Sequence, residues 1–172
     1  MYFNLNGHDQ GKISEQEVEI KAAFFTEIND QVYPNGNILS VKETPLDFTT
    51  AHKIGDKIDT TCPQMERAGG YDHNYVLDDY TGEMREVGRA YAPETGIEMT
   101  ITTDQPGMQF YTANFIADGM KGKDGAVYHK RDGYCFETQD YPDAVHYTHF
   151  PDVVYQAGEP YDTETIYQFG VR

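Results

Sequence analysis

Basic residues and cysteines are scarce in this sequence of 172 residues. It has 13 Lys and Arg side chains against 29 Asp and Glu, a formal net charge of −16 at pH 7. A surface with this excess of negative charge repels phosphate backbones, so we expect no nucleic-acid partner. The two cysteines, Cys62 and Cys135, are too few and too far apart for a disulfide scaffold or a zinc motif. They predict free thiols in a reducing compartment.

Long apolar runs are also missing. No stretch approaches the roughly 20 apolar residues of a membrane helix, and residues 1–7 lack the basic and apolar regions of a signal peptide. The sequence therefore predicts a cytoplasmic protein without a membrane partner. Motifs for chemistry on a bound nucleotide or by a nucleophile are absent as well. His146 and His149 lie three residues apart without a third ligand at a recognised spacing, so no metal site is predicted.

What is present in quantity is aromatic side chains and turn signals. With 14 Tyr and 9 Phe, the chain has too many aromatic residues to be disordered. Helical periodicity is scarce, whereas short runs that alternate or are rich in β-branched and aromatic residues are common. These runs cover residues 18–22, 97–102, 108–115 and 165–169. Turn signals such as Pro34-Asn35-Gly36 separate the runs, and the pattern predicts an all-β sandwich forming one domain over residues 1–172.

Residues 132–143 contain the most conspicuous candidate for chemistry, Glu137. The segment opens with the turn signal Asp132-Gly133 and closes before Pro142, which predicts a strand. On such a strand Cys135, Glu137 and Gln139 share one face, and Tyr134, Phe136 and Thr138 share the other. We expect a desolvated Glu137 whose pKa is shifted toward the range useful for proton exchange. A solvated glutamate on an edge strand is an equal alternative.

Two further clusters carry polar groups suited to binding hydroxyls. Residues 67–75 contain the pair Gly69-Gly70 and predict a loop that presents Asp72 and its neighbours to a ligand. An Asx turn, in which Asp72 bonds only local backbone, is the competing interpretation. Gln109, on the strand after the Pro106-Gly107 turn, can both donate and accept a hydrogen bond, although it would be unremarkable as a half-exposed strand residue. Carboxylates and amides that bind hydroxyls beside flat aromatic rings are typical of a sugar site.

The order of several short blocks resembles one known family, the aldose 1-epimerases or galactose mutarotases. The resemblance runs essentially from the first residue to the last and corresponds to the C-terminal half of those proteins. The blocks are Tyr2-Phe3-Asn4-Leu5, Pro34-Asn35-Gly36 with Pro45-Leu46-Asp47-Phe48, Gly70-Tyr71-Asp72-His73-Asn74, residues 105–114 from Gln105-Pro106-Gly107 to Ala113-Asn114, and Glu137-Thr138-Gln139 with Tyr141-Pro142-Asp143-Ala144.

This resemblance implies a β-supersandwich of the galactose mutarotase type and an enzyme that interconverts the α and β anomers of free hexoses such as galactose and glucose without a cofactor. It assigns Glu137 as the general base. It also assigns Asp72, Gln109 and Tyr2 to substrate binding. A mutarotase-like sugar sensor without turnover is the alternative function.

One departure from the family pattern affects these expectations. The family's general acid is a histidine two residues before the Tyr of the Tyr-Phe-Asn-Leu block, and here only Met1 precedes Tyr2. We therefore expect weak or absent activity from this chain alone, since a general acid contributes about 10²–10⁴ in rate. A sandwich cut at this point would also expose strand edges, which predicts self-association or a missing N-terminal half as partner.

Overall fold

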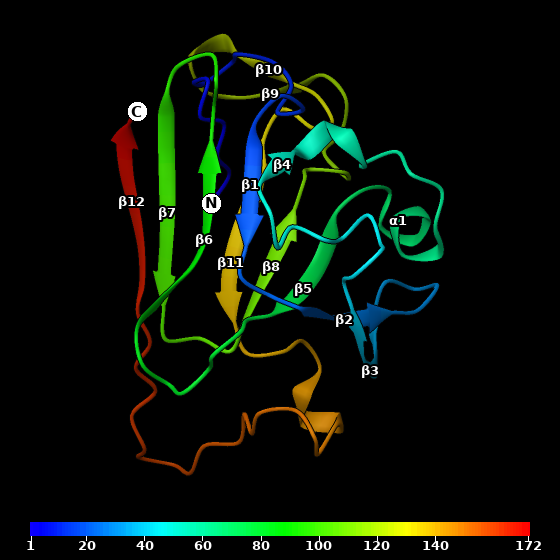
Figure 1. Ribbon diagram of the computed structural model, residues 1–172, viewed down its shortest axis with the longest axis vertical. Coiled ribbons are helices and arrows are strands. Elements are labelled where there is room, and N and C mark those ends of the chain that lie inside the picture. The colour runs from blue at the N-terminus through cyan, green and yellow to red at the C-terminus, as the bar shows by residue number, and fades with distance from the viewer.

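The computed structural model describes residues 1–172 and consists mainly of antiparallel β-strands arranged in two five-stranded sheets (Figure 1). In spatial order, the first sheet contains β12 (Thr165–Val171), β7 (Ile97–Thr103), β6 (Arg85–Tyr91), β1 (Glu17–Ile20) and β4 (His52–Lys53). The second sheet contains β11 (Cys135–Gln139), β8 (Gly107–Tyr111), β5 (Asp72–Val76), β2 (Phe24–Ile28) and β3 (Pro34–Ser40). The prediction of an all-β fold is confirmed.

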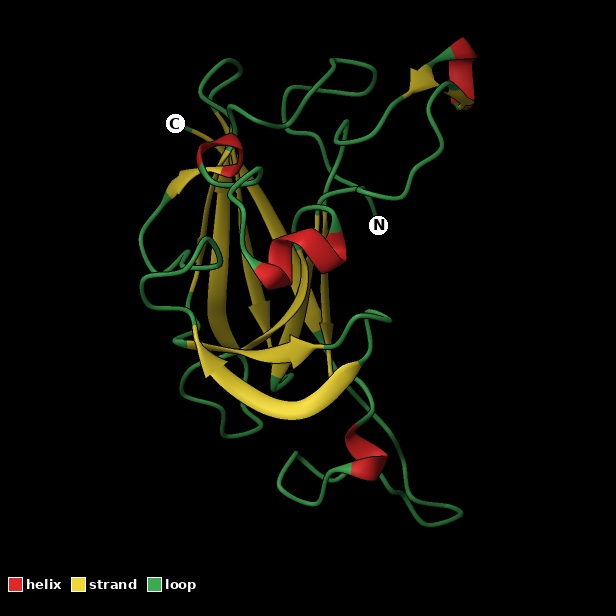
Figure 2. Ribbon diagram, turned by 90° about the vertical axis from the view of Figure 1, so that its right-hand side faces the viewer, coloured by secondary structure: helices red, strands yellow, loops and turns green.

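The remaining elements are short and lie in the connections between strands (Figure 2). They are the helix α1 (Pro63–Ala68), the 3₁₀ turns η1 (Ile54–Asp56), η2 (Lys123–Gly125) and η3 (Ala144–His146), and the two-stranded arm of β9 (Met120–Lys121) and β10 (Val127–Tyr128). None of these helices has the length or apolar character needed to cross a membrane.

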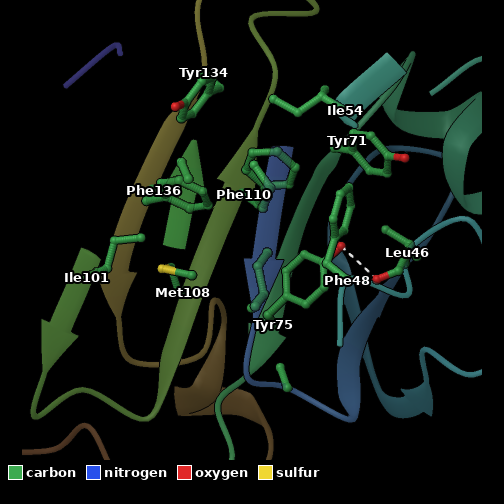
Figure 3. Packing of buried hydrophobic residues seen from close by; sticks show 14 of the residues in the cluster. Leu46, Phe48, Ile54, Tyr71, Tyr75, Ile101, Met108, Phe110, Tyr134 and Phe136 are labelled. Carbon is green, nitrogen blue, oxygen red and sulfur yellow. Dashed lines mark hydrogen bonds between the residues drawn. The ribbon is translucent and has the colours of Figure 1, made fainter. Parts of the chain in front are cut away.

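A single large core of 25 buried residues fills the space between the two sheets. The second sheet contributes Tyr75, Met108, Phe110 and Phe136, and the first sheet contributes residues such as Ile101 (Figure 3). Phe110 stacks on Phe136 with ring centroids 5.0 Å apart. Because side chains alternate along a strand, the burial of these residues leaves their neighbours on the opposite, outer face of the second sheet.

The alternation expected from the sequence is confirmed on the two strands that carry Gln109 and Glu137. Met108 and Phe110 are buried in the core, and so are Tyr134 and Phe136. The strand expected over residues 108–115 is shorter than predicted and ends at Tyr111. It ends there because Ala113 adopts a left-handed backbone conformation with φ of 54°.

The prediction that residues 67–75 form an exposed loop is wrong. Helix α1 ends at Ala68 and is followed by Gly69, whose φ of 65° is the left-handed conformation common at helix C-termini. Gly70 follows, and β5 begins at Asp72. Tyr71 and Tyr75 are completely buried in the core. The two glycines thus mark a tight passage from helix to strand, so Asp72 is held by a sheet and not by a flexible loop.

Candidate functional site

The outer face of the second sheet brings together the polar residues expected from the sequence. Strand β8 lies between β5 and β11, so each of its residues has one partner on each side. Gln109 lies opposite Asn74 on β5 and opposite Glu137 on β11. Directly opposed residues of antiparallel strands point to the same face of the sheet. The three side chains therefore form one row across the sheet.

A second row lies beside the first. Asp72, Tyr111 and Cys135 are opposite one another on β5, β8 and β11. The two rows are connected by a hydrogen bond in which Gln109 Nε2 donates to Asp72 Oδ1 at 2.7 Å. The expected association of Asp72 with Gln109 is therefore observed. The alternative of an Asx turn is not, because Asp72 lies within a strand.

The carboxyl group of Asp72 is held in an environment that disfavours its charge. Burial is the main reason why its pKa is raised above the ordinary value, and the nearby charge of Glu137 acts in the same direction. The hydrogen bond from Gln109 opposes both effects because it stabilises the carboxylate. The Asp72 carboxylate can thus accept hydrogen bonds from hydroxyl groups, and its pKa depends on its burial and on Gln109 and Glu137.

Glu137 differs from the expectation in one respect. It lies on β11, an edge strand of the second sheet, and its side chain is exposed. Of the two alternatives for Glu137, the solvated glutamate on an edge strand is the one observed, and the desolvated glutamate is not. Its position beside Gln109 and near Asp72 agrees with the predicted site. Its role as a base stays a prediction.

Aromatic rings border the polar rows on the side of Tyr111. The ring of Tyr2 lies edge-on to Tyr111 at 6.3 Å, and Phe115 stacks on Tyr111 at 6.2 Å. Partial burial raises the pKa of the Tyr2 hydroxyl, and the neighbouring Cys135, Tyr111 and Glu137 add to this effect. The predicted position of Tyr2 beside the site is therefore consistent with the structure. Sequence reasoning assigned no role to Tyr111 or Phe115, although the alternation along β8 already placed Tyr111 on the face of Gln109.

Cys135 is buried next to this aromatic border. Burial, with a smaller contribution from the charge of Glu137, raises the pKa of its thiol to about 11. A thiol with so high a pKa stays protonated at neutral pH and is a poor nucleophile. Cys135 therefore contributes to the floor of the site and not to its reactivity.

His73 lies between Asp72 and Asn74 in sequence but points away from the site. Its ring is fully buried in the core, edge-on to Phe25, and burial lowers its pKa to about 3. The Gly-Tyr-Asp-His-Asn block therefore supplies only its alternate residues, Asp72 and Asn74, to the outer face. The histidine fills the core as a neutral ring.

A cavity of about 420 Å³ borders the site at Tyr2. The cavity is lined by the N-terminal segment, the connection that carries β9 and β10, and β12. Half of its 14 lining residues are apolar, among them Phe3, Met120 and Phe169. The polar rows of the second sheet do not line this cavity. The candidate site is instead an open face, with two carboxylates grouped around one amide and a border of flat rings. Such a surface can accept hydroxyl hydrogens and stack against C–H groups.

The family model for aldose 1-epimerase matches residues 1–168. The chain belongs to the aldose 1-epimerase family. Among its similar relatives are the galactose mutarotases of Bos taurus, 39% identical over 170 residues, and of Homo sapiens, 36% identical over 170 residues. Both matches cover 99% of this chain and 48% of the relative.

A solved structure agrees with this assignment to the aldose 1-epimerase family. The crystal structure of a GalM/aldose epimerase homologue from C. elegans superposes with a TM-score of 0.84 at 30% sequence identity. The superposition covers 99% of this chain and 49% of the homologue. The chain therefore spans about half the length of the relatives that it matches. The fold of this half is that of the aldose epimerases.

Proposed function

We propose that this chain carries the base and much of the sugar-binding surface of an aldose 1-epimerase acting on hexoses such as galactose and glucose. The observation that carries the proposal is the convergence of Asp72, Gln109 and Glu137 on one sheet face. A relative that is 39% identical over 170 residues is named galactose mutarotase, which supports it. We also propose that residues 1–172 form one domain, equivalent to the C-terminal portion of the family domain.

In the proposed reaction Glu137 is the general base. Its exposed carboxylate takes the proton from the hydroxyl on C1 of the pyranose. The bond between C1 and the ring oxygen then breaks, the ring oxygen gains a proton from an acid, and C1 becomes an aldehyde carbon. Rotation about the C1–C2 bond and closure on the other face give the opposite anomer, with base and acid exchanging roles.

The other assigned residues bind and orient the sugar. The Asp72 carboxylate accepts hydrogen bonds from sugar hydroxyls, and Gln109 can offer an N–H to the same ligand because one amide nitrogen carries two hydrogens. Tyr2 and the adjoining Tyr111 present aromatic edges and faces on which the C–H groups of a pyranose can pack. Orientation of the anomeric hydroxyl toward Glu137 follows from these contacts.

A non-catalytic sugar-binding role is the second candidate. It is favoured by the position of His73, because this histidine of β5 points into the core and not toward the outer face that carries Asp72 and Gln109. On this proposal Asp72 and Gln109 still bind the sugar, while turnover by the chain alone is weak or absent.

Polarimetry on freshly dissolved α-galactose, combined with equilibrium binding of galactose, tests the two functions. We expect Glu137→Gln to lower any turnover by about 10²–10⁴, because the amide cannot accept the proton. Binding should be retained in this variant and lost in Asp72→Ala. Glu19→Gln, on a strand of the other sheet, is the matched control. Unchanged turnover in Glu137→Gln would remove Glu137 from the mechanism, and turnover no faster than buffer with saturable binding would favour the sensor.

A further inference from the structure

Gly107 of β8 has no side chain on the outer face, and neighbouring side chains pack closely against it. Gly107 lies opposite Val76 on β5 and opposite Gln139 on β11. A Cβ at this position would come within 2.5 Å of Asn74 Oδ1, 3.0 Å of a ring carbon of Tyr141 and 3.2 Å of the Gln139 carbonyl oxygen. Any larger residue would therefore displace atoms of the two flanking strands. The absence of a side chain at Gly107 therefore lets the Asn74 amide and the Tyr141 ring pack directly against β8.

The side chain of Gln139 reaches across β8. Its Nε2 donates to Asn74 Oδ1 on β5 at 3.2 Å and to Gln109 Oε1 on β8 at 3.4 Å. Gln109 in turn donates through its Nε2 to Asp72. The amides thus form a chain of donors and acceptors that starts on the edge strand β11 and ends at the Asp72 carboxylate.

We propose that Gln139 and Asn74 are positioning residues that fix the orientation of the Gln109 amide. An amide can present either its oxygen or its nitrogen to a neighbour. Because Gln139 donates to Gln109 Oε1, the Gln109 nitrogen is directed toward Asp72 and the sugar. The inference rests on the proposed function, and it deepens that function by identifying what orients the group that binds the sugar.

An unpaired atom of Asn74 supports this order of donors and acceptors in the row of amides. Asn74 is 2% exposed, and its Nδ2 has no hydrogen-bond partner. Buried donors without partners are rare and need an explanation. Rotating the Asn74 amide would place its nitrogen against the nitrogen of Gln139, so donation by Gln139 accounts for the orientation that leaves Nδ2 unpaired. The unpaired Asn74 Nδ2 therefore accompanies the hydrogen bond that Asn74 Oδ1 accepts from Gln139.

Gln139→Met tests the proposal, because methionine is close in length and cannot donate. We expect the side-chain NH₂ signals of Gln109 to lose their fixed environment in NMR spectra. We also expect the titration of the Asp72 carboxyl group to shift upward, since its hydrogen bond from Gln109 weakens. Galactose affinity should fall about tenfold, which corresponds to about 1.4 kcal/mol. Gln168→Met, an exposed change on β12, is the matched control and should alter none of these readouts.

Gly107→Ala provides an independent second variant, because its methyl group would displace Asn74 Oδ1, the atom that accepts the hydrogen bond from Gln139. It should give the same upward shift of the Asp72 titration. An unchanged titration in either folded variant would overturn the positioning role. A wild-type chain that binds no galactose would overturn the proposed function, and the NMR readouts would then decide the positioning role by themselves.

Discussion

Asp72 and Glu137 are carboxylates on the same face of one sheet, and their surroundings give them different properties. Asp72 lies on an interior strand, accepts a hydrogen bond from Gln109 and has a raised pKa because of burial. Glu137 lies on the edge strand with its side chain exposed. The difference suits the proposed roles, since a residue that binds hydroxyls benefits from fixed geometry and a base must be reached by its substrate.

Asp72→Asn should stabilise the fold at neutral pH while weakening sugar binding. When folding raises the pKa of a carboxyl group, the protonated group contributes fully to the free energy of unfolding at a pH below its unfolded pKa. This contribution is lost as the pH rises through the folded pKa. The neutral amide removes this loss, so we expect a gain of about 0.5–1 kcal/mol at pH 7. Urea denaturation at pH 7 and at pH 4 measures the effect.

The gain from Asp72→Asn should shrink as the pH falls from 7 to 4, because a carboxyl group with a raised pKa takes up its proton at a higher pH than an ordinary one. Asp162→Asn, a change on an exposed loop, is the control for removing one negative charge. A destabilised Asp72→Asn at pH 7 would contradict the idea that burial of this charge opposes folding.

At the scale of elements, the two sheets end at the edge strands β11 and β12, which lie close to each other. Thr138 on β11 and Thr165 on β12 are joined through their hydroxyl groups, and Tyr167 donates to the Phe136 carbonyl at 2.6 Å. Beyond β12 no further strand continues the first sheet. β12 has no charged residue between Thr165 and Val171 and exposes Ile166, Phe169 and Val171. Unpaired edges of this composition favour pairing with another chain.

We expect the chain to self-associate through β12 at high concentration. The net charge of −16 opposes association, so added salt should promote it. Ile166→Lys places a charge on the edge strand and should shift the weight-average mass in sedimentation experiments toward the monomer. Val154→Lys is the control, because this exposed residue lies outside every strand. A wild-type monomer at high concentration and high salt would rule out the prediction.

At the scale of the whole molecule, stability depends on one core between the sheets that also contains a histidine. His73 is completely buried, and its Nε2 atom has no partner. Burial lowers its pKa to about 3, compared with about 6.5 for an unperturbed histidine. The folded protein therefore excludes a proton that the unfolded chain binds in mild acid.

This difference in the pKa of His73 predicts that the free energy of unfolding decreases in mild acid. Stability should be complete above pH 6.5 and fall as pH decreases toward 3, with a loss of about 2 kcal/mol by pH 5. His73→Phe should show a shallower dependence of unfolding free energy on pH between 7 and 5, because its ring never takes up a proton. His146→Gln, an exposed change, should keep the wild-type slope. Equal slopes in wild type and His73→Phe would exclude His73 as the cause.

The pattern of residues along single strands determined which side chains share a face. Alternation was sufficient to separate Phe110 from Gln109 and Phe136 from Glu137, because successive residues of a strand point to opposite sides whatever the strand contacts. It was also sufficient for the all-β architecture. The order of the blocks indicated the family to which the chain belongs.

Only the tertiary structure decided how the strands lie next to one another. The placement of β8 between β5 and β11 brings Gln109 within reach of Asp72, 37 residues earlier, and sets Glu137 opposite it. The order of strands in a sheet and the exposure of its edges depend on contacts between distant segments, which no local pattern encodes. For that reason the strand pattern alone left a buried and a solvated Glu137 as equal alternatives and predicted a loop around Asp72, whereas the folded chain has an exposed edge glutamate and an aspartate held within a sheet.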